Sequence, residues 1–292
     1  MNGIAHAPQK SRKKLRTRVP FNDGYSTCED CGVSASSIEI VRTLMLGAAL
    51  IFVWGLQRLS PHTTVNTNWR TNIGLWLIDV VLTRAICGAC GIAIAISGEQ
   101  LGSGVLRWFA VPPWFGVVLG VVALDGVAWL WHRANHRLAW LWRFHSIHHT
   151  DLAFQVTTAL RFHPGELLLA LPVRLFAIAF LGVPPLGVVV FEIVFGTMNL
   201  FVHGNIKLGR ASESALAGLI ITPALHRLHH ARDTSDLNSN FGTVFSLFDR
   251  LAGTLRASDS RRVFATGLPD SGEVVDLRLT QALAAPFRTA IR

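Results

Sequence analysis

Histidine is concentrated in three short segments of this 292-residue chain. One segment holds His132 and His136, and two others repeat the pattern His-x-x-His-His, at 145–149 and 226–230. A single such triplet is expected by chance in roughly 0.02 of chains with this histidine content. Clustered imidazoles are typical of metal sites, whereas solvated basic helix faces do not require this repetition. The pattern therefore predicts a metal centre.

The spacing within each segment suits a helix. Residues three and four apart lie on one face of a helix, one turn above each other. His132 and His136 can thus reach one metal or two adjacent metals. In each His-x-x-His-His box the adjacent pair diverges by about 100° around the helix axis, so its members can serve two different ions. Three such helices can enclose two metals without a bridging carboxylate.

Imidazole binds Zn, Fe, Cu and Ni, so ligand type alone does not select the metal. A histidine-only zinc hydrolase needs three protein ligands and one open position. The clustered histidines are too numerous for that site and fit two metals better. Two redox-active irons beside an apolar membrane interior would favour oxygen chemistry on a lipid.

The composition and the apolar runs predict an all-α integral membrane protein. Half of the residues are apolar and 15% are charged, against about a quarter charged in soluble domains. No strand-type alternation persists. Five apolar stretches suit membrane helices, the last two forming a hairpin about a Gly-Val-Pro-Pro turn. They are 43–59, 73–96, 114–131, 167–181 and 186–202.

We expect a polar basic tail at 1–37, a membrane-embedded catalytic domain at 38–256 and a C-terminal tail at 257–292. The formal net charge is +9, with a basic block at 10–18. Beside a membrane span this block predicts a contact with anionic headgroups or a cytoplasmic N-terminus, and not a nucleic-acid site. The segment 97–113, rich in Gly and Pro, predicts a re-entrant or interfacial connection.

Two Cys-x-x-Cys pairs, Cys28/Cys31 and Cys87/Cys90, raise the alternative of a zinc site. Cys87 and Cys90 lie in an apolar run, where cysteine commonly packs as a small hydrophobic residue. Cys28 and Cys31 resemble half of a metal knuckle or a redox pair. Neither pair indicates a secreted disulfide framework.

The chain from about Asp125 to Thr254 resembles the fatty acid hydroxylase/sterol desaturase superfamily of membrane di-iron enzymes. The similarity is carried by motifs around and between the histidine boxes. They are Asp125-x-x-x-Trp129-x-x-His132-Arg133, Leu141-Trp142-Arg143-Phe144-His145, His148-His149-Thr150-Asp151, Arg161-Phe162-His163-Pro164-Gly165-Glu166, Phe201-Val202-His203-Gly204-Asn205, His226-x-x-His229-His230, Asp236-x-Asn238-x-Asn240-Phe241-Gly242 and Phe248-Asp249-Arg250-x-x-Gly253-Thr254.

This resemblance implies an integral membrane helical bundle with a histidine-rich cap that holds a dimetal site. It also implies two iron ions, O2 as co-substrate, and hydroxylation or desaturation of a C–H bond in a lipid or sterol-like substrate. Electrons would come from a ferredoxin- or rubredoxin-like donor with its reductase. The membrane is expected to be the inner, cytoplasmic one, with the histidine site on the cytoplasmic side. The implied iron ligands are His132, His136, His145, His148, His149, His203, His226, His229 and His230.

Further residues are candidates for the surroundings of the metals. Some family members carry another histidine where this chain has Asn199, and His163 is either a ligand or a neighbour of one. Metal-bound histidines usually donate their second N–H to a carboxylate or a carbonyl. The acidic candidates for that contact are Asp125, Asp151, Glu166, Asp233 and Asp236. Asp125 is favoured because a carboxylate inside an apolar span is costly without a functional partner.

Two alternatives compete with an oxygenase. A non-catalytic membrane metal-binding or transport protein would place its ligands along a path through the spans, whereas these boxes lie at helix ends. A metal-dependent membrane hydrolase would consume no oxygen. Substrate identity, and the choice between hydroxylation and desaturation, depend on three-dimensional placement.

Overall fold

The computed structural model describes residues 35–64, 69–86, 90–109, 111–257, 262–269 and 277–288. Within these ranges the chain forms helices and loops, with three isolated β-bridges and no strand. The basic block and the Cys28, Cys31 and Cys87 positions lie outside the described residues, so the cysteine predictions stay untested there. Cys90 is a free thiol at the start of α3.

Five long stretches of helix are apolar enough to cross a membrane. Three of them begin with proline in the first turn, where the missing N–H costs no hydrogen bond. In the stretch that holds α1, only 6% of the apolar window is buried within the protein, as expected of a helix that faces lipid. The membrane helices are α1 (Ala35–Leu59), α2 (Trp69–Ile86) with α3 (Cys90–Gln100) and α4 (Val105–Trp108), α5 (Pro113–Arg137), α7 (Pro164–Leu181) and α8 (Pro185–Val202).

The predicted hairpin at 167–202 is confirmed as α7 and α8. The helix α7 ends at Gly182, whose φ of 68° is the left-handed conformation that favours glycine. A Cβ atom built on Gly104 would lie 2.2 Å from the Cα atom of Gly182. The two glycines therefore let the chain before α4 pack directly on the α7–α8 turn.

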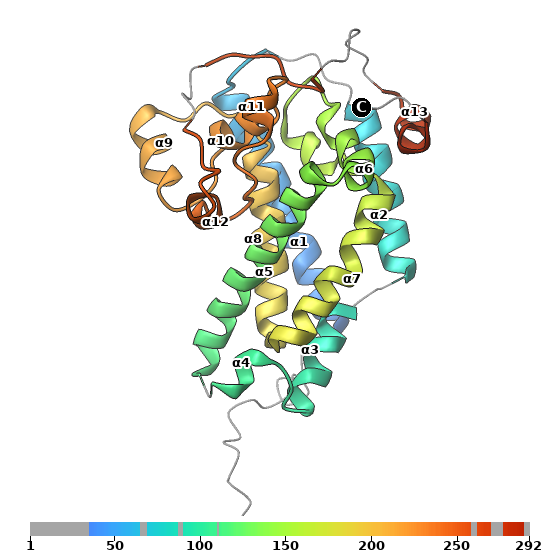
Figure 1. Ribbon diagram of the computed structural model, residues 1–292, viewed down its shortest axis with the longest axis vertical. Helices are drawn as coiled ribbons and strands as arrows, with labels where there is room; N and C mark the ends of the chain where they lie inside the picture. The colour runs from blue at the N-terminus through green and yellow to red at the C-terminus, as the bar shows by residue number, and fades with distance from the viewer. Residues whose placement is uncertain are drawn as a thin grey trace, which may run out of the picture.

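The long helices form a bundle with the remaining elements gathered as a cap at one end (Figure 1). The helices α1, α5 and α8 lead into the cap, whereas α2 and α7 lead away from it. The segment around α4 lies at the opposite end, so the interfacial interpretation of 97–113 fits better than the re-entrant one. The cap elements are α6 (Ala139–His149), η1 (Val156–Leu160), α9 (Arg210–Ala217), α10 (Pro223–His229), α11 (Thr234–Leu237), α12 (Leu247–Leu251), α13 (Leu279–Ala284) and η2 (Ala285–Phe287).

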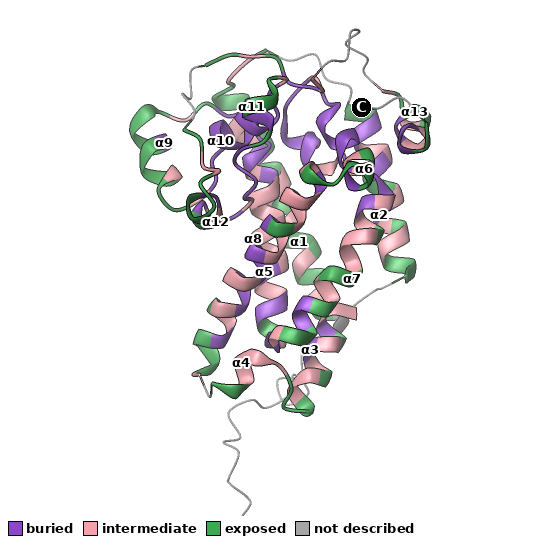
Figure 2. Cartoon of the chain, viewed as in Figure 1, coloured by how far each residue is buried: buried purple, intermediate pink, exposed green. Residues whose placement is uncertain are grey.

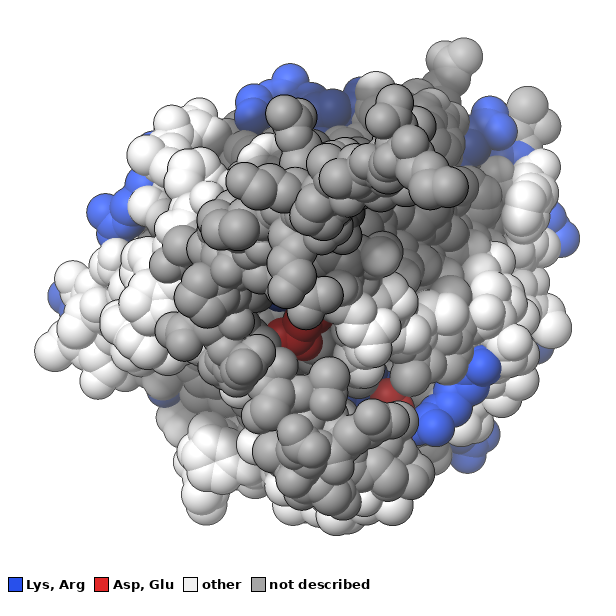
Figure 3. Space-filling view, turned by 90° about the horizontal axis from the view of Figure 1, so that it is seen from below, with Lys and Arg blue, Asp and Glu red and all other residues white. Residues whose placement is uncertain are grey.

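Burial is uneven along the molecule. Buried residues are densest in the cap, whereas intermediate and exposed residues dominate the bundle (Figure 2). Large apolar side chains such as Phe52, Val81 and Phe176 are 65%, 67% and 68% exposed. Seen from the end away from the cap, the visible described surface is mainly uncharged, with lysine and arginine at the periphery (Figure 3). This distribution suits an apolar bundle in lipid that carries a self-contained polar cap.

Part of the predicted C-terminal tail is folded. Ala282 and Ala285 are buried with Leu75 of α2 and Ile147 of α6 in one apolar cluster. The hydroxyl of Thr71 also donates to the carbonyl of Leu277 at 3.0 Å. Residues 277–288 therefore belong to the wall of the cap.

Two buried aspartates join the cap to α5. Asp125 accepts hydrogen bonds from the backbone N–H groups of Val244 and Phe245, at 3.3 and 3.1 Å. Asp249 accepts four hydrogen bonds of 2.6–3.0 Å, and its donors are the Trp129 indole, the N–H groups of Phe241 and Gly242, and the Thr254 hydroxyl. The carboxylates thus hold the 241–254 segment against the end of α5.

The variant Asp249→Ala leaves these four donors without an acceptor in a buried position. We expect a loss of about 3 kcal/mol or more in the free energy of unfolding, because each orphaned donor retains its desolvation penalty. Thermal unfolding of the purified protein in detergent measures this loss. The exposed helix cap Asp233 supplies the control, since Asp233→Ala should cost about 1 kcal/mol. Equal losses in the two variants would contradict the role of Asp249.

Candidate metal centre

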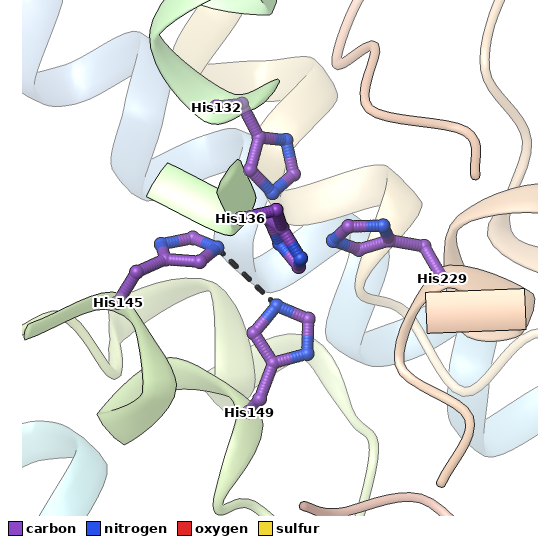
Figure 4. A group of neighbouring side chains, drawn as sticks. All are labelled: His132, His136, His145, His149 and His229. Carbon is purple, nitrogen blue, oxygen red and sulfur yellow. Dashed lines mark hydrogen bonds between the residues drawn. The ribbon is translucent and has the colours of Figure 1, made fainter. Parts of the chain in front are cut away.

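Nine histidines converge inside the cap in two neighbouring groups. In each group the available ligand atoms lie within 4.8 Å of one another. Figure 4 shows the rings of the first group pointing toward a common centre. The first group is His132, His136, His145, His149 and His229, and the second is His148, His203, His226 and His230.

Each helix distributes its histidines between the two groups as the sequence spacing predicts. His132 and His136 project from adjacent turns at the end of α5. In α6 the adjacent histidines separate, with His149 in the first group and His148 in the second. The third box does the same at the end of α10. Here His229 joins the first group, whereas His226 and the helix C-cap His230 join the second.

The two groups share a wall. The rings of His149 and His230 are stacked, with centroids 4.2 Å apart, and the rings of His148 and His149 are 5.4 Å apart. Each of these pairs takes one member from each group. The arrangement therefore holds two adjacent sites and not two distant ones.

Most of the identified outer partners are backbone carbonyls. The Nδ1 atoms of His132, His203 and His229 lie 2.6–2.7 Å from the carbonyl oxygens of Phe241, Asn199 and Ser239. His148 Nδ1 lies 3.3 Å from the Arg161 carbonyl. These contacts leave the Nε2 atoms to face inward, because the Nδ1 position is occupied.

Glu166 is the acidic candidate that contacts a histidine of the centre. Its Oε1 atom lies 2.9 Å from His145 Nδ1 and also accepts a hydrogen bond from the Asn135 amide at 3.0 Å. Glu166 stands in the first turn of α7, where a carboxylate is favoured by the helix dipole. Asn135, which lies between His132 and His136 in sequence, was not predicted from the sequence.

The other predicted neighbours have different partners. Asp125, the favoured candidate, binds backbone N–H groups of the 241–254 segment. Asp151 accepts hydrogen bonds from Asn72, Thr158 and the backbone of Ala153. Asp233 caps α11, and Asp236 pairs with Arg256 and Arg262. The sequence motifs identified these residues, but their role is to hold the cap together.

His163 and Asn199 lie outside both groups. His163 Nδ1 accepts the N–H of Gly165 as the N-cap of α7, and its Nε2 is 3.2 Å from the Leu283 carbonyl. The Asn199 amide donates to the Ala159 carbonyl at 3.1 Å. Asn199 thus contributes to the centre through its own carbonyl, which faces His203.

A buried arginine organises the loop behind the second group. The Arg161 side chain is 0% exposed and donates to the Ile147 carbonyl, the Thr150 hydroxyl and the Asn72 amide oxygen. These contacts fix the carbonyl of Arg161 against His148. The basic residue in the Arg-Phe-His-Pro-Gly-Glu segment is the signal for this role, although its partners are distant in sequence.

The donor set fits bound cations. The Nε2 atoms of His148 and His203 are 3.0 Å apart, as are those of His203 and His226, and those of His145 and His149 are 3.2 Å apart. Two imidazole nitrogens that bind one ion at about 2.1 Å and at right angles lie about 3.0 Å apart. The buried Nε2 atoms of His132, His136 and His229 have no hydrogen-bond partner. A cation in each group would satisfy these inward lone pairs.

Burial lowers the pKa of several of these imidazoles. It is the main cause that brings the pKa of His203 to about 4 and that of His229 to about 3, against the opposing hydrogen bonds to the Asn199 and Ser239 carbonyls. Burial, with the adjacent histidines, also holds the pKa values of His148, His149, His226 and His230 well below 6.5. Neutral imidazole is the form that binds metal, so the site is prepared for cations at neutral pH.

Comparison with known proteins agrees with this geometry. The sequence profile of the fatty acid hydroxylase family matches residues 117–254, which contain all nine histidines. The ornithine lipid hydroxylase OlsE of Rhizobium tropici is 31% identical over 243 residues, covering 79% of this chain and 71% of the relative. The cholesterol 25-hydroxylase of Rattus norvegicus is 27% identical over 170 residues, covering 56% of each chain.

The alkylglycerol monooxygenase of Homo sapiens is 27% identical over 171 residues, which cover 56% of this chain and 35% of the relative. No solved structure gives a significant match. The residues matched by the family profile include most of α5 and all of α6, α8 and α10, the elements that carry or directly precede the histidines of both groups. The chain therefore belongs to the fatty acid hydroxylase family.

Proposed function

We propose that this membrane protein is a di-iron hydroxylase that uses O2 to oxidise a C–H bond of a lipid. The observation that carries the proposal is the convergence of nine imidazoles from α5, α6, α8 and α10 into two neighbouring groups. Oxygen-reactive iron is bound by imidazole. The names of the relatives, which include hydroxylases and a monooxygenase of lipids, support the same chemistry.

The two groups would hold one iron each. His132, His136, His145, His149 and His229 form one ligand set, and His148, His203, His226 and His230 form the other. When bound, the iron pair supplies the reduction of dioxygen and the oxidation of the substrate. The chain orients five of the nine rings through the carbonyls and Glu166 described above, which raises the basicity of the inward nitrogen.

Aromatic side chains exclude water from the centre. Phe162 stacks on His148 with ring centroids 4.4 Å apart. Phe241 packs on the rings of His132, His136 and His229 at 5.2–5.8 Å. A dry enclosure strengthens electrostatic interactions and prevents loss of reactive species to solvent. These rings therefore suit oxidation of an apolar substrate.

We infer that the electrons come from a separate protein. The sequence contains no nicotinamide fingerprint, cytochrome motif or complete iron–sulfur motif. A ferredoxin- or rubredoxin-like carrier with its reductase would supply them at the cap, on the cytoplasmic side of an inner membrane. Because α1 leads into the cap, this placement replaces the cytoplasmic N-terminus expected from the basic block. Turnover in the presence of a nicotinamide cofactor alone would contradict this inference.

The direct test uses labelled oxygen. Lipids are extracted from cells with and without the gene after growth under ¹⁸O2 and are compared by mass spectrometry. We expect one labelled oxygen atom in a lipid that appears only with the gene.

The variant His148→Ala should abolish this product and lower the iron content, because it removes a ligand of the second group and leaves its neighbours unpaired. His163→Asn, which can still cap α7, should retain both. Two irons per chain in His148→Ala would refute the ligand assignment.

The contact between Glu166 and His145 generates a second prediction. Glu166→Gln keeps the size of the side chain but removes the charge that orients the imidazole. We expect a loss of about 10- to 100-fold in metal affinity, the usual effect of removing such a partner. Metal competition with a chelator measures the affinity. Glu213→Gln, a buried glutamate that contacts Thr222 away from both groups, provides the control. Equal metal affinity in Glu166→Gln and the unmodified chain would contradict the role.

The lowered histidine pKa values predict the stability of the metal-free protein. Since the folded-state pKa lies below the unfolded value of 6.5, the unfolded chain binds more protons as the pH falls. The free energy of unfolding should therefore decrease below about pH 6.5, each such imidazole contributing up to about 1.4 kcal/mol per pH unit. Thermal unfolding at a series of pH values measures the trend. A melting temperature that stays constant on acidification would show that the imidazoles are not held neutral.

A further inference from the structure

A cavity of about 300 Å³ lies beside the second histidine group. It is bounded by the residues after α1, the loop after α6, the end of α10 and the 263–266 segment. Its volume is at the lower end of the range of about 300–1,000 Å³ found for small-ligand sites. The cavity can therefore take a compact polar group.

The cavity has a cationic lining. Arg227 and Arg232 line it together with the hydroxyl side chains of Thr63, Thr64 and Thr266, and none of the described lining residues is acidic. Guanidinium and hydroxyl groups are the donors that bind phosphate and carboxylate oxygens. The side chains that line the cavity therefore favour the binding of an oxyanion such as phosphate or carboxylate.

Arg227 is buried without a full set of acceptors. The residue is 5% exposed, its Nη2 donates to the Ile206 carbonyl at 3.1 Å, and its Nε has no partner. The nearby Glu213 is outside the cavity and accepts a hydrogen bond from the Thr222 hydroxyl. A buried guanidinium with an unused N–H group carries a desolvation penalty that a bound anion would offset.

Phe154 separates the cavity from the metal groups. Its ring lines the cavity and lies 5.1–6.4 Å from the rings of His203, His226 and His230. The Arg227 guanidinium lies 5.7 Å from the centre of the same ring. A ligand bound to Arg227 would thus be separated from the second histidine group by the ring of Phe154.

The cavity also lies at the depth expected of lipid headgroups. His62, Thr63 and Thr64 follow directly after α1, whose last turns carry Trp54 beneath the Arg58 guanidinium at 5.2 Å. Tryptophan and arginine at the end of a span are typical of the membrane–water interface. The Thr63 loop is fixed to the end of α8 through the Asn205 side chain, at 2.7 Å and 3.2 Å. This position favours a lipid head over a freely soluble anion.

We propose that this cavity binds the anionic head, phosphate or carboxylate, of the lipid that the enzyme oxidises. The assignment rests on the proposed function and narrows its substrate class to lipids with an acidic headgroup. Arg227 supplies the anchoring charge, and Arg232, whose Nε donates to the Leu268 carbonyl, adds a second guanidinium at the wall. Thr64 adds a hydroxyl group, and Phe154 separates the bound head from the metal centre.

Binding to the full-length protein in a neutral detergent tests the site without turnover. Glycerol 3-phosphate serves as the soluble probe and is titrated by calorimetry, with inorganic phosphate in a parallel titration. Nanodiscs of phosphatidylcholine, with or without phosphatidylglycerol, then compete for the probe. We expect glycerol 3-phosphate to bind and to be displaced only by the discs that contain phosphatidylglycerol. Displacement by inorganic phosphate without displacement by the anionic discs would assign the site to a free oxyanion and overturn the proposal.

Charge-removing variants locate the site. Arg227→Gln and Arg232→Gln should each weaken binding by roughly tenfold or more, the effect of one charged hydrogen bond. Arg232→Gln provides the decisive comparison if Arg227→Gln fails to fold, because Arg232 is only partly buried. Lys207→Gln removes the same charge from an exposed position near Ile206 and should change binding by less than roughly twofold. Unchanged binding in Arg232→Gln, or no binding in the unmodified protein, would overturn the proposal.

Oxidation of lipid is measured in the same preparations. Loss of probe binding in Arg232→Gln with retained oxygen transfer to phosphatidylglycerol would overturn the cavity assignment while leaving the hydroxylase function intact. Intact probe binding without any oxygen transfer, in protein that carries iron and receives electrons, would instead count against the proposed function.

Discussion

Nine imidazoles brought together in the cap are the feature on which the rest of this structure depends. Their inward nitrogens lie as close as 3.0 Å to one another. The Nε2 atoms of His132, His136 and His229 have no hydrogen-bond partner, and burying such atoms is unfavourable unless a proton or a cation is shared. Low pKa values make protons poor partners at neutral pH. The site is therefore built for metal ions, whose binding would offset the cost of burial.

This requirement explains the construction of the cap. Metal ligands need fixed orientation, and the partners identified here are mostly rigid backbone carbonyls, with Glu166 as the acidic exception. Those carbonyls lie mostly in loops, and the loops must in turn be held in place by other side chains. Asp249 holds the loop that contains Phe241, and Arg161 holds the one that faces His148. The buried charged side chains of the cap thus affect the histidines indirectly, by fixing the loops whose carbonyls contact them.

The main contribution of the membrane helices is to position the histidine groups and not to supply reactive side chains. The helices α5 and α8 carry ligands at their ends, while their exposed apolar sides are suited to lipid. The cap consequently lies against the membrane, where an oxidant can meet a lipid without crossing bulk water. The basic cavity beyond Phe154 adds a polar contact to this apolar surface. The apolar bundle and the basic cavity thus lie on either side of the histidine groups, as the proposed binding of a lipid tail and an anionic head requires.

The repeated histidine spacing and the long apolar runs determine a membrane helical protein with clustered histidines that could hold metal. These are local patterns, because periodicity on a helix decides which face a side chain occupies and length decides whether a helix spans a bilayer. The sequence also indicated Glu166 as a possible partner. It offered Asp125 for the same role, whereas in the structure this carboxylate accepts backbone N–H groups that are distant in sequence.

Only the tertiary structure decided how the ligands divide into two groups and which carbonyls orient them. It also brought Arg227, Arg232 and the residues after α1 around one cavity. Backbone carbonyls are present at every residue and leave no signature in the order of side chains. Their selection, and the meeting of segments separated by many residues, depend on how the helices pack in three dimensions.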